Sequence, residues 1–228
     1  MDNVGESRSY ELAHLVCVAR SFWLNYCDRE DSCIESTRLI CEIGKLLKAK
    51  VQPFSVRALA LNKPSTQHVQ ECPTATMQSA SMLHNGWSVG IGYPRENGMA
   101  PKPNAWESHL IAIWQFEGGS KRYLIDASLD QASRPQKEMD LIPLCLELPD
   151  DVPETSVMKI PLELSDHLVI PAMYRGCLIY YESCDLDYRE TGAWTRDGWV
   201  EDMATEVLES HASLWLSKHG STGTLGAT

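Results

Sequence analysis

One cysteine stands where a helix is predicted to begin, in the segment EDSCIESTRLICEIG at 30–44. Ser32 and Glu35 have the spacing of a capping box, in which the serine hydroxyl binds the amide three residues on and the glutamate binds the serine amide. Cys33 is therefore expected to be the first residue of this helix. Unpaired amides and the macrodipole at a helix N-terminus favour the thiolate, and they can also stabilise the oxyanion that forms when a thiolate attacks a carbonyl carbon. Cys33 is thus a candidate nucleophile.

A nucleophilic cysteine needs a base, and the chain has seven histidines. Six of them lie in predicted amphipathic helices, in polar or irregular segments, or near the C-terminal tail: His14, His68, His84, His167, His211 and His219. His109 is the one that opens a predicted buried strand, SHLIAIWQF at 108–116. It is therefore the candidate base.

A second apolar run, RYLIDAS at 122–128, follows this strand after a Gly-Gly turn, which is typical of a buried antiparallel hairpin. If the glycines at 118–119 form the turn, Asp126 lies opposite Ile111. His109 faces the same side of the sheet as Ile111, so His109 and Asp126 are expected to be diagonal neighbours. A buried aspartate is costly unless it is paired, and His109 is the available partner.

These side chains need a core to hold them, and hydrophobic spacing predicts the elements that build it. Apolar residues at three- and four-residue steps predict helices at 9–26, 33–49 and 199–220. Alternating or continuous apolar runs predict strands at 51–62, 87–93, 108–116, 122–128, 144–148 and 176–183. The rest of 62–108 is rich in Pro, Gly, Ser, Asn and Thr, and it is expected to be loop.

The helix that carries the candidate nucleophile is expected to be amphipathic. Its spacing places Ile40, Ile43, Leu46 and Leu47 on the inner face. Gly44 is expected to let a neighbouring element approach closely, because glycine has no Cβ.

Length and composition favour a single globular domain at 1–220, followed by a small-residue tail at 221–228 that we expect to be disordered. The chain has 228 residues, of which 43% are hydrophobic and 22% are charged. A formal net charge of −11 argues against nucleic acid as a partner, because that binding rests on clustered Lys and Arg. No secretory signal and no run of 18 apolar residues is found, so we expect a cytoplasmic protein that does not bind membranes.

The eight cysteines lie mostly inside apolar stretches, where reduced cysteine behaves as a small hydrophobic residue. We therefore expect core thiols rather than disulfides. The chain has no C-x2-C pair, and the spacing of Cys27 and Cys33 is wrong for a structural zinc site. No metal site is expected.

The order of these features resembles the transglutaminase-like branch of the papain-like cysteine superfamily, and in particular its uncharacterised bacterial members. The segments that carry the resemblance are SCIESTRLICEIGKLLKAKVQPFSV, SHLIAIW and YLIDASLDQASRP. The resemblance implies an α+β fold with a papain- or transglutaminase-like core, in which the nucleophile helix packs on an antiparallel sheet. It also implies that Cys33 is the nucleophile, that His109 is the base, and that Asp126 holds the imidazole tautomer.

The resemblance further implies a hydrolase or acyltransferase that attacks an amide, thioester or isopeptide carbonyl and needs no cofactor. Its substrate would be a protein, a peptide or a small acyl compound, and hydrolysis and transfer both stay open. Trp87 and Trp106 are candidates for substrate contact because they lie in the loop-rich section that should border the cleft. Gln131, just after the aspartate strand, either contacts substrate or lies in a solvated turn. The alternative function is a non-catalytic binding module that keeps the fold and uses the cleft for recognition.

Overall fold

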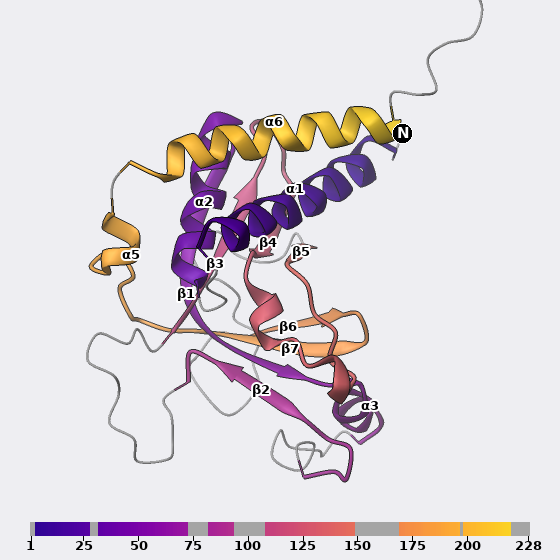
Figure 1. The fold of residues 1–228 in the computed structure, drawn as a ribbon. Coiled ribbons are helices and arrows are strands. Elements are labelled where there is room, and N and C mark those ends of the chain that lie inside the picture. The colour runs from indigo at the N-terminus through magenta and orange to yellow at the C-terminus, as the bar shows by residue number, and fades with distance from the viewer. Residues whose placement is uncertain are drawn as a thin grey trace, which may run out of the picture.

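The computed structural model describes residues 3–27, 32–72, 82–93, 108–148, 169–196 and 198–219. This part of the chain is a mixed helix and sheet structure, as expected, and its strands form a nearly closed antiparallel sheet (Figure 1). In the described ranges, no helix is long and apolar enough to cross a membrane.

The helices and strands have the following bounds. The helices are α1 (Asn3–Cys27), α2 (Cys33–Leu46), α3 (Lys63–Glu71), α5 (Gly192–Thr195) and α6 (Val200–His219), with two short 3-10 helices, η1 (Leu129–Ala132) and η2 (Pro135–Lys137). The strands are β1 (Lys50–Leu61), β2 (Ser88–Ile91), β3 (His109–Gln115), β4 (Arg122–Asp126), β5 (Leu144–Glu147), β6 (Val169–Tyr174) and β7 (Cys177–Ser183).

Strand β1 connects the two halves of the sheet, whose order is β5-β4-β3-β1-β7-β6, with β2 also paired to β1. Its first half pairs with β3, and its second half pairs with β7 on one edge and β2 on the other. The two halves meet at Val56, which is opposite both His109 of β3 and Ser183 of β7. The candidate base therefore lies where β1 changes partners.

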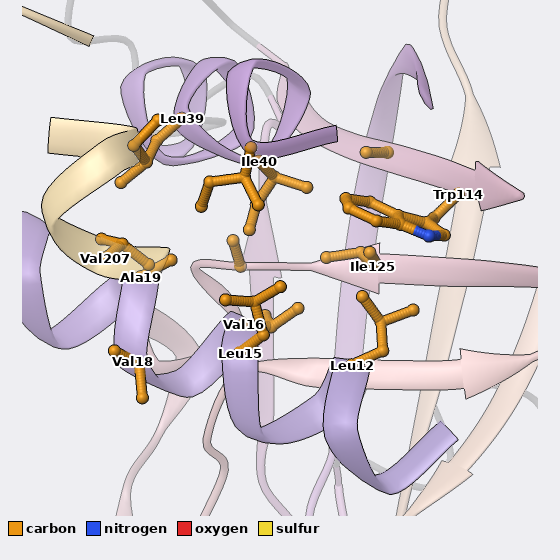
Figure 2. Close-up of a cluster of buried hydrophobic side chains, with 14 of the residues drawn as sticks. Leu12, Leu15, Val16, Val18, Ala19, Leu39, Ile40, Trp114, Ile125 and Val207 are labelled. Carbon is orange, nitrogen blue, oxygen red and sulfur yellow. The ribbon is translucent and has the colours of Figure 1, made fainter. Parts of the chain in front are cut away.

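Helices α1, α2 and α6 cover the face of the sheet that carries Trp114 and Ile125 (Figure 1). Figure 2 shows how their side chains meet between helices and sheet, with Leu12, Leu15, Val16 and Ala19 from α1, Leu39 and Ile40 from α2, and Val207 from α6. Each of these side chains is nearly or fully buried. Burying such a residue contributes roughly 1.5 to 3 kcal/mol, so this core fixes α2 against β1 and β3.

A second core lies on the opposite face of the sheet. It contains Ile111 of β3, Leu124 of β4 and Tyr181 of β7. Side chains alternate along a strand, so His109 and Asp126 face this second core, two residues from Ile111 and Leu124.

The hairpin of β3 and β4 has the predicted register but a different turn. Ala112 is opposite Ile125 and Gln115 is opposite Arg122, which is the pairing expected from the sequence. The amide of Gly119 donates to the carbonyl of Phe116 at 3.0 Å, so the centre of the turn is 117–118 rather than 118–119. The register survives because both strands stop short of the turn.

The inner face of α2 was predicted only in part. Ile40 and Ile43 are buried as expected, whereas Leu46 and Leu47 are 50% and 43% exposed. That part of the prediction is wrong because α2 ends at Leu46, and the chain then leaves the helix to enter β1. Gly44 allows the predicted close approach, since a Cβ there would overlap with Val51 Cγ2.

Two other helix predictions need correction. Helix α1 begins at Asn3 rather than at 9, and α3 lies within the segment expected to be loop. The amide of Ser65 donates to the side chain of Asn62 at 3.2 Å, which caps α3, and a proline occupies its first turn. Asn62 and this proline were the available sequence signals for the start of a helix. They were missed because α3 has too few apolar residues to show a helical period. The predicted tail at 221–228 lies outside the described residues.

Candidate active site

Cys33 is the first residue of α2, as predicted, but no capping box holds it. Ser32 makes no side-chain cap hydrogen bond, and its hydroxyl accepts from Arg20 Nη1 at 2.8 Å instead. The expected capping box is therefore wrong, because a charged guanidinium that is 2% exposed is a stronger donor to the hydroxyl than a main-chain amide. The N-cap side chain therefore leaves the first-turn amides of α2 free of its own hydroxyl.

The Cys33 thiol is partly exposed and lies beside a small apolar cluster. The cluster consists of Ile34, Leu110 and Tyr188, with Ala193 and Trp194 packed against them. The hydroxyl of Thr37 donates to the carbonyl of Leu110 at 2.9 Å, which ties the first turns of α2 to the start of β3. The thiol is thereby held next to the end of β3 at which His109 lies.

His109 is the first residue of β3, and its side chain is fully buried. Gly92, just after β2, packs against its main chain. A Cβ at Gly92 would lie 2.6 Å from the carbonyl carbon of Ser108 and 2.7 Å from the nitrogen of His109. Gly92 also has a φ of +77°, a left-handed conformation that favours glycine. The end of β2 therefore supports the position of His109.

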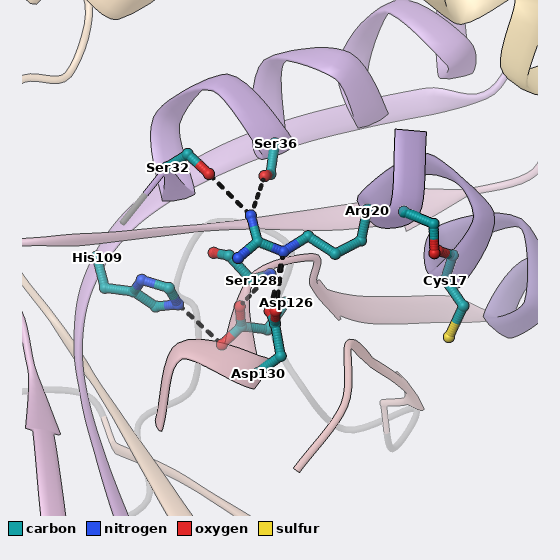
Figure 3. A network of polar contacts seen from close by, with 9 residues as sticks. Cys17, Arg20, Ser32, Ser36, His109, Asp126, Ser128 and Asp130 are labelled. Carbon is teal, nitrogen blue, oxygen red and sulfur yellow. Dashed lines mark hydrogen bonds and ion pairs between the residues drawn. The ribbon is translucent and has the colours of Figure 1, made fainter. Parts of the chain in front are cut away.

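Asp126, the last residue of β4, accepts three hydrogen bonds and is fully buried. Its Oδ2 lies 2.8 Å from His109 Nε2 and accepts from the Tyr181 hydroxyl at 3.0 Å, and its Oδ1 accepts from the amide of Ser128 at 3.1 Å. Figure 3 shows the imidazole pointing at the carboxylate. The predicted contact between His109 and Asp126 is confirmed, and their catalytic role stays a prediction.

The surroundings of Asp126 place a proton on Nε2 of His109. Oδ2 of Asp126 accepts from the Tyr181 hydroxyl and Oδ1 accepts from the Ser128 amide, so Asp126 acts as an acceptor here and Nε2 donates to it. Burial lowers the pKa of His109, but the charge and hydrogen bond of Asp126, together with Cys33, raise it by more, to about 10. The ring is therefore positively charged at neutral pH.

The remaining ring nitrogen of His109, Nδ1, does not contact Asp126. Nδ1 of His109 is buried and has no partner that meets the geometric limits of a hydrogen bond among the described residues. Cys33 nevertheless lies close enough to raise the pKa of His109 through its charge and its hydrogen-bonding capacity. The thiol therefore lies near the imidazole.

Two groups of the site were missed by the sequence analysis. Tyr181 is separated from Asp126 by 55 residues, and the alternation of β7 alone does not reveal its partner. Arg20 is separated from Asp130 by 110 residues, and its Nε lies 3.0 Å from Asp130 Oδ1 (Figure 3). A signal did exist for Arg20, because it stands on the apolar face of α1 beside Val16 and Trp23 and therefore needs a buried partner.

The predicted substrate contacts are not all near His109. Trp87 precedes β2 and lies at the other end of β1, where Leu61 is opposite Ser88, about 17 Å along the strand from the residue that pairs with His109. Its ring packs under Lys137 Nζ at 4.6 Å. Gln131 lies in η1, which begins three residues after Asp126, and its side-chain nitrogen is buried without a partner among the described residues. Trp106 lies outside the described residues.

No group of three or more His, Cys, Asp or Glu side chains in the described ranges is arranged to hold a metal ion. Comparison with protein-family models, curated proteins and solved structures finds no match to this chain.

Proposed function

We propose that this chain is a cysteine-dependent hydrolase or acyltransferase of the transglutaminase-like, papain-like kind, acting through Cys33, His109 and Asp126. The observation that supports it most is the contact of 2.8 Å between two fully buried groups, His109 and Asp126, beside a thiol at a helix N-terminus. A buried ion pair is costly to desolvate and is a weak source of stability. Beside a partly exposed thiol it favours a chemical role.

In the proposed reaction, the resting site is a thiolate and imidazolium pair. His109 holds the proton released by Cys33, and Asp126 stabilises the charged ring. Cys33 Sγ attacks the carbonyl carbon of the substrate, a sulfur–carbon bond forms, and the carbonyl electrons move onto oxygen. The first-turn amides of α2, which the Ser32 hydroxyl does not cap, stabilise this oxyanion.

The intermediate then collapses. The carbonyl re-forms, the bond to the leaving nitrogen or sulfur breaks, and His109 donates its proton to the leaving group. The acyl group remains on Cys33 as a thioester. Water or an amine then loses a proton to His109 and attacks this thioester, which releases an acid or an amide and regenerates the thiolate.

The same arrangement supports a papain-like core as part of the proposal. The helix that carries the nucleophile precedes the histidine strand and the aspartate strand in the chain, and it packs on β1 and β3. The substrate is a protein, a peptide or a small acyl compound. The acceptor decides between hydrolysis and transfer, because both use the same acyl-enzyme.

The proposal is tested by acylation with a simple thioester, the acetyl thioester of N-acetylcysteamine, followed by peptide mass spectrometry. We expect the acetyl group on Cys33, and we expect Cys33→Ser to abolish labelling. Cys41 and Cys145 should stay unlabelled because burial raises the pKa of each to about 12. Cys72→Ser is the matched control and should leave the labelling of Cys33 unchanged.

A label spread over several thiols according to their exposure would contradict the proposal. The same holds if Cys33 takes up no acetyl group and no acetate is released from the thioester, while the folded protein still reacts at Cys72. Either result would favour the binding module, which keeps the cleft but does not use the thiol.

A further inference from the structure

Arg20 joins three segments of the site. Its guanidinium is 2% exposed and lies between α1, the first turn of α2, and η1 (Figure 3). Nε donates to Asp130 Oδ1 and Oδ2 at 3.0 and 3.1 Å, and Nη1 donates to the hydroxyls of Ser32 and Ser36 at 2.8 and 3.0 Å. Asp130 follows Asp126 by four residues, so Arg20 links the start of the nucleophile helix to the segment after the aspartate strand.

These hydrogen bonds change what Ser32 does at the start of α2. A serine at this position normally accepts from an amide in the first turn. Two other helices of this chain begin in that way: Asn62 accepts from the amide of Ser65 in α3, and Thr191 accepts from the amide of Trp194 in α5. In α2 the Ser32 hydroxyl is turned to Arg20 and makes no cap hydrogen bond to the first turn.

A second observation at the same place points to a ligand. His109 is fully buried, and its Nδ1 has no hydrogen-bond partner among the described residues. Uncapped amides and a charged imidazole beside one thiol form a site that favours a negative group. The charge of Arg20 is largely balanced by Asp130, so Arg20 acts here through the hydroxyls that it holds rather than through its own charge.

We propose that Arg20 is a positioning residue: by holding the Ser32 and Ser36 hydroxyls, it keeps the first turn of α2 uncapped, so that its amides bind the oxyanion. The inference rests on the proposed function of Cys33. The positioning role of Arg20 needs the forked guanidinium, because a lysine that remained paired with Asp130 could not reach both hydroxyls in this geometry.

The test compares two alkylating probes at Cys33, anionic iodoacetate and neutral iodoacetamide, with rates read by peptide mass spectrometry. The ratio of the two rates reports how well the helix start accommodates a negative group, whereas a general loosening of the fold changes both rates together. The variant is Arg20→Met with Asp130→Asn, which leaves the net charge unchanged. We expect the iodoacetate to iodoacetamide ratio to fall about two- to fivefold, because the released Ser32 hydroxyl caps the turn.

Adding Ser32→Ala to this variant removes the competing cap, so the ratio should return to within about twofold of the wild type. Ser21→Ala, an exposed serine beside Arg20, is the matched control and should not restore it. Arg175→Met with Asp140→Asn removes an exposed Arg–Asp pair and should leave the ratio at the wild-type value.

Failure of Ser32→Ala to restore the ratio, or an unchanged ratio in the Arg20 and Asp130 variant, would overturn the inference. If that variant does not fold, as judged by near-UV circular dichroism, Arg20→Lys takes its place with the same expected fall and rescue. Failure of the proposed function is seen separately, because the wild-type Cys33 would then react with iodoacetamide no faster than Cys72.

Discussion

At the scale of single residues, two opposing effects set the pKa of His109. Burial alone favours the neutral ring, whereas Asp126 and Cys33 favour the charged ring and raise the pKa to about 10. The positive charge therefore depends on Asp126, and the three groups hydrogen-bonded to that carboxylate hold it in place. Tyr181 remains a donor because burial and the charge of Asp126 raise its pKa well above the usual value.

His109→Ala is expected to slow alkylation of Cys33 by iodoacetamide at pH 7 by about tenfold, because an ordinary thiol is only a few per cent ionised at that pH. The rate is measured by mass spectrometry on the folded protein. Rates at Cys72 serve as the internal reference and should not change. An unaltered rate at Cys33 would mean that thiol and imidazole do not interact.

Asp126→Asn is expected to slow alkylation of Cys33 to a similar extent, because the imidazolium loses the carboxylate that stabilises it. The unfolding free energy should also fall by about 1 to 3 kcal/mol, since an amide nitrogen would face groups that donate. Urea unfolding and iodoacetamide kinetics are measured on the same sample.

The matched control for that change is Tyr181→Phe, which removes one donor and leaves the carboxylate in contact with His109. We expect it to keep most of the thiol reactivity. A loss of stability in Asp126→Asn with full reactivity at Cys33 would assign Asp126 a purely structural role.

At the scale of elements, the end of β2 is a support for the histidine strand. Gly92→Ala combines a left-handed φ with a Cβ that would meet the main chain of Ser108 and His109. We expect a loss of about 2 to 4 kcal/mol in unfolding free energy and slower alkylation of Cys33, because His109 must shift.

Gly118→Ala is the control for backbone strain, because Gly118 also has a left-handed φ, of +68°, but nothing lies within 4 Å of its Cβ position. It should cost about 1 to 2 kcal/mol and leave the Cys33 rate unchanged. Equal effects on thiol reactivity from both variants would show that β2 does not position His109.

The contacts between elements show which parts of the site could be predicted from the sequence. The contact of His109 with Asp126 follows from one hairpin, whose alternation and short loop are local properties of the chain. The contacts of Tyr181 with Asp126 and of Arg20 with Asp130 join segments 55 and 110 residues apart, and they depend on which strands and helices become neighbours. The capping box failed for the same reason, since a distant arginine took the serine hydroxyl.

At the scale of the whole molecule, His109 links stability to pH. Its pKa is raised above the unfolded value of 6.5, so the stability it contributes is fully present below pH 6.5 and is lost as the pH rises through about 10. We compare Cys33→Ala with the double variant Cys33→Ala and Asp126→Asn, because neither has a thiol at position 33 that titrates. The difference between their unfolding free energies should shrink as the pH rises from 6.5 to about 10. Urea unfolding at several pH values measures it, and a pH-independent difference would contradict a charged pair.

The position of β1 between the two halves of the sheet also sets the order in which its strands can pair during synthesis. During synthesis β1 is made early, yet β7, the strand on one of its edges, is made more than a hundred residues later. Until then that edge of a twelve-residue strand is unpaired, which is the condition under which strands of different chains associate. Because β7 also carries Tyr181, the donor set of Asp126 is completed only after this late pairing. A nascent chain that stops before β7 therefore has the cysteine, the histidine and the aspartate, but a carboxylate that lacks one of its three donors.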